Sequence, residues 1–291
     1  MKKKSFVSLL AVMLGLPALA LAQGGKVFDA LTLPSKILSM ERKYAVYLPP
    51  DYDTSQRSYP VLYLLHGAGD DQTGWVQFGE VQRLADEAIR NGTATPMIII
   101  MPDADTGRRG YVNTADGQWN YEDFFFQELM PHVEKTYRIK AAKRYRAIAG
   151  LSMGGGGSFY YALHHPELFS SACPLSASCG ALSLADAREN YQKNNKGAPL
   201  TDEQVESFYK RYSVLELVKA MPDEQKKAVR WYIDCGDGDF LYEGNSLVHI
   251  AMRKKEIPHE FRVQDGEHNW TYWRRSLPTV LTFVSDAFHQ Y

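Results

Sequence analysis

Cysteine is scarce in this chain of 291 residues, which contains only Cys173, Cys179 and Cys235. Three cysteines allow at most one intramolecular disulfide, and this excludes the small disulfide-stapled folds found among secreted proteins. Because free cysteine is among the most frequently buried residue types, we expect three small buried hydrophobic side chains rather than a structural bridge.

Long apolar runs and an excess of charge of one sign are also missing. After the N-terminus, no segment reaches the roughly 20 apolar residues that a membrane-spanning helix needs. The 33 basic and 34 acidic residues give a formal net charge of −1, so the composition favours neither nucleic acid nor an anionic membrane as a partner. The chain has no H-E-x-x-H, paired C-x-x-C or P-loop motif, and we expect neither a metal nor a nucleotide cofactor.

The N-terminal 22 residues have the three-part pattern of a secretory signal peptide. Three lysines at positions 2–4 are followed by an apolar run at 6–16 and by Ala20-Leu21-Ala22, small residues at the spacing of a cleavage site. The alternative is an uncleaved membrane anchor. We predict that residues 1–22 are removed and that the chain is exported, either to the periplasm or outside the cell, with no membrane insertion afterwards. No repeat or linker divides residues 23–291, which are predicted to form a single domain.

Apolar runs alternate with helical patterns along the remaining chain. Runs without strict alternation are typical of strands buried on both faces, so the pattern predicts an α/β fold with a mostly parallel central sheet and helices on both faces. The earliest strands are candidates for antiparallel pairing, and the ligand site is expected at the carboxyl ends of the strands. The predicted strands are 43–49, 60–66, 97–102, 145–150, 171–177, 229–234 and 260–264, and the predicted helices are 80–91, 122–136, 153–165, 242–255 and 276–288.

The segment 183–228 interrupts this alternation. It is charged, helical in pattern and longer than an ordinary connection between two strands. We predict a helical insertion there, which is either a lid over the ligand site or a solvated surface segment.

One serine stands in a setting that suits a nucleophile. In "AIAGLSMGGGGS", residues 147–158, a predicted strand ends just before Ser152 and a helix begins just after it. Such a sharp turn strains the serine backbone, and glycines at 150 and 154 avoid collisions with neighbouring elements. The pattern G-x-S-x-G therefore predicts a nucleophile elbow with its hydroxyl at the edge of the sheet.

Two backbone N–H groups are candidates for stabilising an oxyanion. The stretch "LLHGAGDD", residues 64–71, follows a predicted strand and contains a His-Gly turn. The residue after the nucleophile and a loop after an early strand are the usual sources of such donors. We therefore predict an oxyanion hole formed by the N–H groups of Ala68 and Met153.

A base and an acid follow the serine in the chain. Of the eight histidines, His268 in "DGEHNW" lies just beyond the last predicted strand, where a loop can bring its imidazole to Ser152. The acid is expected after the strand 229–234, where "DCGDGDF" offers Asp239, with Asp237 as its rival. The order Ser152, Asp239, His268 is that of an α/β-hydrolase triad.

The sequence at this point resembles the esterase-D-like α/β-hydrolases, particularly the feruloyl and acetylxylan esterases that act on plant cell-wall xylan. The matching stretches include "YPVLYLLHGAGDDQTGW", "AIAGLSMGGGGSFYYALHHPELF", "DCGDGDFLY" and "GEHNWTYWRRSLP", and they extend from about Lys43 to the C-terminus. The resemblance implies the same triad and the same oxyanion residues. The chain departs from many relatives at Asn269, where they carry aspartate.

The resemblance implies an exported serine esterase that hydrolyses feruloyl or acetyl esters on xylan or its oligosaccharides through an acyl-enzyme. Trp119 and Trp270 are candidate substrate contacts, because aromatic faces suit phenolic groups and sugar rings. The alternatives are an acyltransferase of the mycolyl-transferring type, another small-ester hydrolase such as an S-formylglutathione or siderophore esterase, and a non-enzymatic carbohydrate-binding protein.

Overall fold

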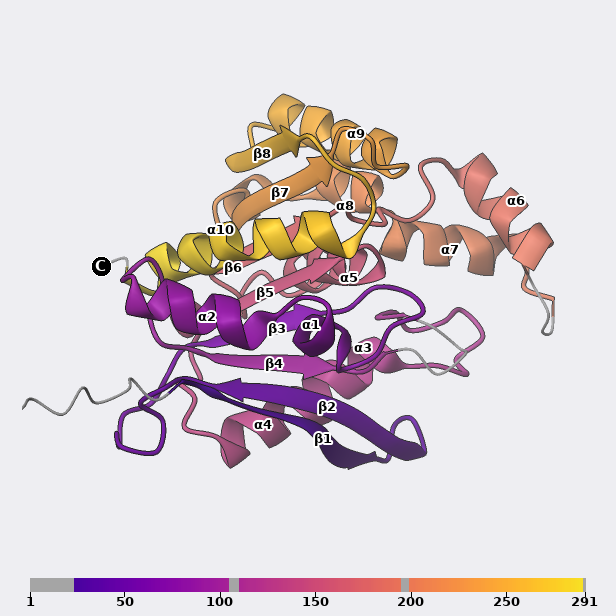
Figure 1. Cartoon of the computed structure of the whole chain (residues 1–291). Helices are drawn as coiled ribbons and strands as arrows, with labels where there is room; N and C mark the ends of the chain where they lie inside the picture. Colours follow the sequence, from indigo (N-terminus) through magenta and orange to yellow (C-terminus); the bar gives the residue numbers. More distant parts are fainter. Residues whose placement is uncertain (1–23, 105–109, 195–198, 290–291) are drawn as a thin grey trace, which may run out of the picture.

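A computed structural model describes residues 24–104, 110–194 and 199–289 (Figure 1); the predicted signal peptide lies outside these residues. The described chain forms one eight-stranded sheet in the order β1-β2-β4-β3-β5-β6-β7-β8. The strands are β1 (Lys26–Ser35), β2 (Met40–Leu48), β3 (Val61–Leu65), β4 (Ile98–Pro102), β5 (Arg146–Leu151), β6 (Ser171–Leu175), β7 (Arg230–Gly236) and β8 (His259–Gln264).

The pairing follows the predicted pattern. Strand β2 runs antiparallel to β1 and β4, and the strands from β4 to β8 are all parallel. Strands β3 to β6 are buried along almost their whole length, which explains their continuous apolar runs. The predicted α/β-hydrolase fold is thereby confirmed. Strand β1 was missed, because it lies at the edge of the sheet, is mostly exposed and has no apolar run.

Helices cover both faces of the sheet. On one face lie α1 (Gly74–Gln77), α2 (Val81–Arg90) and α10 (Trp270–His289), whose apolar side chains share a core with those of the strands. The other face is covered by α3 (Tyr121–Phe124), a π-helical turn η1 (Phe125–Leu129), α4 (Met130–Thr136), α5 (Met153–His164), α8 (Val214–Ala220) and α9 (Tyr242–Lys254). Two 3₁₀ turns, η2 (Lys143–Tyr145) and η3 (Asp223–Gln225), complete the elements apart from α6 and α7.

Helix α10 begins six residues earlier than the pattern predicted. The side chain of Asn269 accepts the N–H of Tyr272 at 3.1 Å, as an N-cap residue does. The predicted start at 276 was wrong because Pro278, which favours a helix start, lies inside the helix. As a result, the helix starts two residues after His268 and holds that residue near its N-terminal end.

The predicted helical insertion is confirmed in type but is shorter than predicted. Helices α6 (Leu184–Asn194) and α7 (Asp202–Tyr212) pack on each other and lie beyond the edge of the sheet at which the parallel strands end (Figure 1). Helix α8 instead belongs to the core, because Val214 and Val218 are fully buried and the helix packs on α5 and α9.

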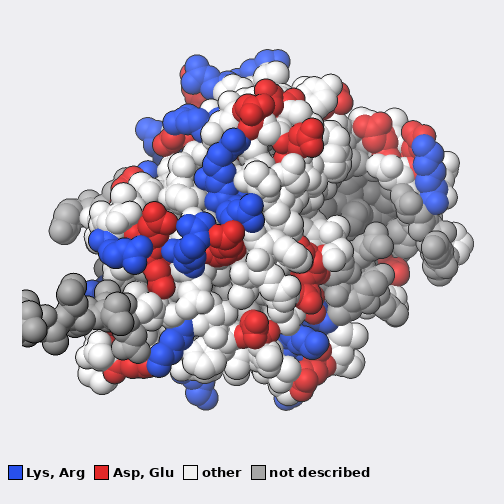
Figure 2. Space-filling view, viewed as in Figure 1, with Lys and Arg blue, Asp and Glu red and all other residues white. Residues whose placement is uncertain are grey.

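All three cysteines are free and buried, as the sequence predicted. Within the described residues, no helix combines the length and apolar composition needed to cross a bilayer. On the face shown in Figure 2, Lys and Arg side chains are interspersed with Asp and Glu side chains rather than gathered by sign.

Candidate active site

The nucleophile elbow has the strained geometry that its sequence predicts. Ser152 joins β5 to α5 with a φ of 54° and a ψ of −116°, a region that residues with a side chain rarely occupy. A Cβ at Gly150 would lie 2.5 Å from the carbonyl oxygen of Gly154, and a Cβ at Gly154 would lie 2.6 Å from that of Leu65. Only glycine fits at either position, so the turn lifts the Ser152 hydroxyl clear of the backbone.

Three side chains from distant parts of the chain meet at this turn. The Nε2 atom of His268 lies 2.9 Å from the Ser152 hydroxyl, and its Nδ1 atom lies 2.8 and 3.0 Å from the two carboxylate oxygens of Asp239. An ionised carboxylate only accepts hydrogen bonds, so Nδ1 carries the proton and Nε2 is free to accept that of Ser152. The arrangement can therefore pass a proton from the hydroxyl to the ring.

The carboxylate of Asp239 is held in its charged form. Its burial opposes ionisation, but hydrogen bonds from His268, from the N–H of Leu241 and from Ser176 outweigh that cost and keep the pKa of the carboxyl below its ordinary value. Asp237, the rival acid, is exposed and accepts the N–H of Gly266 instead. The structure therefore brings Asp239, and not Asp237, to His268.

Sequence analysis missed Ser176, which supports the acid. This residue follows β6, has a positive φ of 43° and is buried. Its hydroxyl accepts the indole N–H of Trp273 at 3.0 Å while it supports Asp239. The rule that identified Ser152, a polar residue directly after a buried strand, also applies to Ser176 in "SACPLSAS" and was a usable signal.

The two segments that carry the predicted oxyanion residues both adjoin Ser152. A Cβ at Gly67 would be 3.4 Å from the Cβ of Ser152, so the His-Gly turn packs directly against the nucleophile. Met153 is the first residue of α5, and its N–H has no acceptor within the helix because the first N–H groups of a helix lack one. The positive end of the α5 dipole adds to the stabilisation of negative charge at this point.

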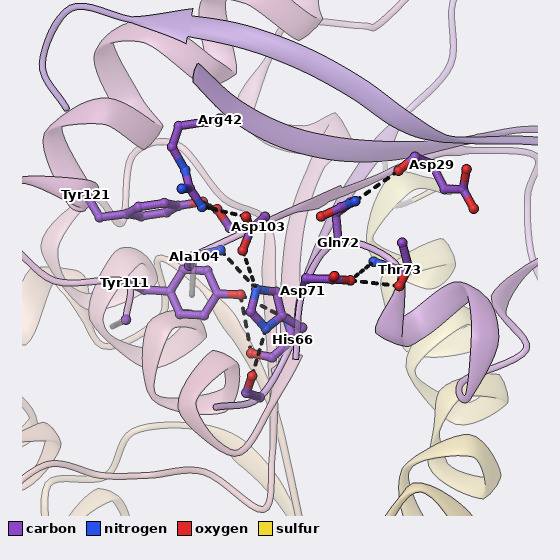
Figure 3. A network of polar contacts seen from close by, with 12 residues as sticks. Asp29, Arg42, His66, Asp71, Gln72, Thr73, Asp103, Ala104, Tyr111 and Tyr121 are labelled. Atoms are coloured by element: carbon purple, nitrogen blue, oxygen red, sulfur yellow. Dashed lines mark hydrogen bonds and ion pairs between the residues drawn. The ribbon is translucent and has the colours of Figure 1, made fainter. Parts of the chain in front are cut away.

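A buried network fixes the orientation of the Gly67–Ala68 peptide (Figure 3). The Nε2 atom of His66 accepts the N–H of Ala104 at 2.9 Å, so its proton lies on Nδ1, which donates to the Gly67 carbonyl at 2.7 Å. In a trans peptide the N–H points away from the carbonyl. Holding the Gly67 carbonyl against His66 therefore turns the N–H of Ala68 to the opposite side.

The network continues away from the turn and anchors the segment that contacts His66. Arg42 lies 2.7 Å from the carboxylate of Asp103, and Tyr121 donates its hydroxyl to the Asp103 carbonyl at 2.8 Å. Both ion-pair partners are buried, so solvent screens the pair little. The hydroxyl of Tyr111 also accepts the backbone N–H of His66 at 2.9 Å. The predicted oxyanion turn is therefore supported by β2, by the chain after β4 and by α3.

The two predicted aromatic contacts differ in accessibility. Trp119 is only 2% exposed, stacks on Tyr121 and donates its indole N–H to Gly110 at 2.9 Å. A substrate would reach it only after its neighbours rearranged. Trp270 is partly exposed and packs at 5.8 Å on Phe78, which is itself 49% exposed. Trp270 is therefore partly accessible to solvent, and it lies two residues after His268 in the chain.

A further exposed aromatic residue lies beside the candidate triad. The ring of Phe240 is 70% exposed, and its centroid lies 4.4 Å from that of His268. The sequence reasoning did not single it out, although it directly follows Asp239. Across the described part of the chain, no group of three His, Cys, Asp or Glu side chains is arranged to hold a metal ion.

Comparisons with known proteins agree with this geometry. The family model described as "Putative esterase" matches residues 35–284. The endo-1,4-beta-xylanase/feruloyl esterase of Xylanibacter ruminicola is 37% identical over 243 residues, which cover 80% of this chain and 28% of that protein. The S-formylglutathione hydrolase of Mus musculus is 26% identical over 285 residues, 90% of each chain.

A solved structure of a ferulic acid esterase is 36% identical and superposes with a TM-score of 0.79, covering 91% of this chain and 99% of that one. In length, however, this chain spans only 28–29% of the first relatives that it matches, the Xylanibacter protein among them.

Proposed function

Because this chain belongs to the esterase family, we propose that it is a serine carboxylic-ester hydrolase with Ser152, His268 and Asp239 as its catalytic triad. The observation that carries the proposal is the continuous chain of hydrogen bonds from the Ser152 hydroxyl through His268 to Asp239. A nucleophile, a base and a group that orients the base are what acyl transfer to a serine requires.

In the proposed reaction, His268 takes the proton of Ser152 while the serine oxygen attacks the ester carbonyl. The N–H groups of Ala68 and Met153 stabilise the oxyanion, and Asp239 stabilises the imidazolium that forms. His268 then donates its proton to the departing alcohol, which leaves an acyl-enzyme. Water repeats the same steps, releases the acid and restores the serine.

The proposed substrate is a feruloyl or acetyl ester on xylan or its oligosaccharides. Its support is the similarity to proteins named feruloyl or ferulic acid esterases, one of which is also named a xylanase. Xylan is too large to enter a cell, so we also propose that residues 1–22 direct export. N-terminal sequencing of the protein recovered outside the cytoplasm should then begin at Gln23.

The test compares methyl ferulate and acetylated xylan as substrates of the purified protein. We expect hydrolysis of at least one of them, and labelling of the wild type but not of Ser152→Ala by a fluorophosphonate probe. A protein that binds xylan but hydrolyses neither ester, and whose Ser152 is unlabelled, would be the non-enzymatic alternative.

A second candidate function is hydrolysis of S-formylglutathione, a thioester. It is favoured by the similarity to the Mus musculus enzyme, which extends over 90% of both chains. The same triad would serve, since the serine attacks a thioester carbonyl as it does an ester carbonyl. A higher kcat/KM for S-formylglutathione than for both ester substrates would replace the proposal above.

A further inference from the structure

A fully buried carboxylate lies behind the candidate triad, on the strand that leads to Asp239. Asp234 in β7 accepts hydrogen bonds from the hydroxyl of Tyr272, from the hydroxyl of Tyr232 at 2.9 Å and from the side-chain amide of Gln264 at 3.4 Å. Within the described residues, no Lys, Arg or His side chain forms an ion pair with it. Buried charges are ordinarily paired, so this carboxylate calls for a specific role.

The two tyrosines both act as donors to this carboxylate. Burial, together with the neighbouring Asp234, raises the pKa of Tyr232 and of Tyr272 above the ordinary value of a phenol. Each hydroxyl therefore keeps its proton and donates it to the carboxylate. The two donors are alike in chemistry, but their rings lie in different surroundings.

The ring of Tyr272 packs against the loop that carries His268. Tyr272 lies in the first turn of α10 and is 2% exposed. A Cβ at Gly266 would lie 2.3 Å from Cδ2 of Tyr272, and a Cβ at Gly236 would lie 2.2 Å from the carbonyl oxygen of Gly266. The loop before α10 is therefore held between the end of β7 and the tyrosine ring.

The ring of Tyr232 packs elsewhere. Tyr232 lies within β7, and the centroid of its ring is 5.6 Å from that of Phe283, in the second half of α10. Tyr232 and Tyr272 are therefore a matched pair of hydroxyl donors to one carboxylate, and Tyr272 is the one whose ring contacts the loop of His268.

The backbone of Asp234 is joined to the acid of the candidate triad. Its carbonyl accepts the N–H of Ser176 at 2.7 Å, and the hydroxyl of Ser176 supports Asp239. Asp234 is thus connected to the acid through its backbone and to the loop of His268 through its side chain.

Resting on the function proposed above, we propose that Asp234 is a positioning residue for His268. Its hydrogen bond to Tyr272 fixes the first turn of α10 and, with it, the loop that carries the imidazole. Asp234 acts through this tyrosine and not by contact with the substrate. Because a misplacement of about 1 Å can cost about 100-fold in rate, the bond should matter for turnover more than for substrate binding.

The experiment removes one hydroxyl at a time from the same carboxylate. Tyr272→Phe and Tyr232→Phe should lower the thermal unfolding midpoint by similar amounts. Only Tyr272→Phe should lower kcat on methyl ferulate or acetylated xylan, by about tenfold or more with little change in KM, since a displaced base weakens the transition state and not substrate binding. Equal losses of kcat in the two variants, or no loss in Tyr272→Phe, would overturn the proposal.

A pair of variants at the carboxylate tests rescue. Asp234→Asn keeps an oxygen that accepts the Tyr272 hydroxyl, whereas Asp234→Ala removes it. Asp234→Asn should therefore retain more of the wild-type kcat than Asp234→Ala. The opposite order would contradict positioning through this hydrogen bond.

Nuclear magnetic resonance gives a measurement that needs no substrate. The proton on Nδ1 of His268, which is shared with Asp239, should give a downfield proton resonance that is absent from His268→Ala. This resonance should shift or broaden in Tyr272→Phe and stay in place in Tyr232→Phe, and the same spectrum in both variants would overturn the proposal. A wild type that shows the resonance but hydrolyses no ester would instead contradict the proposed function.

Discussion

The edge of the parallel sheet and the helical insertion α6–α7 are built in different ways. At the edge of the parallel sheet, Ser152 and Asp239 follow the buried strands β5 and β7, and His268 follows the more exposed strand β8. The Asp239 side chain has no exposed surface. Helices α6 and α7 are mostly half-exposed or exposed, and they reach the core through polar contacts such as Tyr212 with Glu122. The comparison teaches that the candidate triad is held by the buried sheet and the insertion by a few polar contacts, so the two regions should respond separately to mutation.

The largest expected effect is the loss of turnover on every ester when the sheet-edge region is broken. Ser152→Ala and His268→Ala should each lower kcat by about 10⁵-fold, because the members of a triad act as one unit. Thermal unfolding should show an intact fold in both variants. Activity within a hundredfold of the wild type in either variant would exclude the triad.

The second-largest effect tests which of two aspartates on one loop is the acid of the candidate triad. Asp239→Asn should lower kcat by about 10³-fold or more, because the amide no longer fixes the tautomer or stabilises the imidazolium. Asp237→Asn is the matched control and should have a much smaller effect, since its carboxylate contacts the backbone of Gly266. Steady-state kinetics in which the order of the two variants is reversed would transfer the acid role to Asp237.

A smaller effect on kcat is expected from removing His66, which supports the predicted oxyanion turn. His66→Phe keeps a ring of similar size but removes the donor to Gly67 and the acceptor for Ala104. We expect kcat to fall by about 10- to 100-fold with little change in KM, because an oxyanion contact acts mainly in the transition state. Tyr121→Phe, which removes a hydroxyl from the same network without touching the turn, should cost less. A wild-type kcat in His66→Phe would show that the turn keeps its shape without the imidazole.

The smallest effect on catalysis, and the clearest on stability, is expected from changing Glu122, which ties the end of α7 to α3 and α5. The burial of Glu122 disfavours its charge, but hydrogen bonds from His164, His165 and Tyr212 outweigh it and hold the pKa of the carboxyl well below its ordinary value. Its contribution to stability is therefore complete at neutral pH and is lost as the pH falls below about 4.3, the unfolded value, towards the lower folded value.

Glu122→Gln should accordingly lower the free energy of unfolding by about 3 kcal/mol at pH 7, the scale for breaking a buried ion pair. Urea unfolding should show the difference from wild type narrowing below pH 4. Glu206→Gln, in an exposed pair with Lys210 on α7, is the control and should leave the unfolding midpoint unchanged. A difference of constant size from pH 7 to pH 3 would mean that the loss comes from packing and not from charge.

The same comparison explains what could be predicted from the sequence. The nucleophile elbow could be predicted because its signal is local: the collisions that Gly150 and Gly154 avoid arise within one turn around Ser152. The positions of Asp239 and His268 could be predicted because the ends of parallel strands meet at one edge of the sheet. The contact between Glu122 and Tyr212 joins residues 90 positions apart with no local pattern in either, so no periodicity revealed it.

The burial of single aromatic residues could not be predicted from the sequence. Trp119 and Trp270 were selected as candidate substrate contacts by residue type and loop position. Only the three-dimensional packing shows that Trp119 is buried and that Trp270 is partly exposed. Strand β1 was missed for a related reason, since an exposed edge strand needs no apolar pattern.

The four consecutive glycines at the start of α5 have a consequence for how the protein acquires its reactivity. Each glycine weakens an isolated helix by about 1 kcal/mol relative to alanine, while the tight contacts of Gly154 with Leu65 and of Gly155 with Ala177 exist only after the sheet has assembled. Helix α5 is therefore formed by its surroundings and not by its own sequence. We therefore expect the strained turn at Ser152 to form only once its neighbouring strands have assembled, so that labelling of this serine would report that this part of the fold is complete.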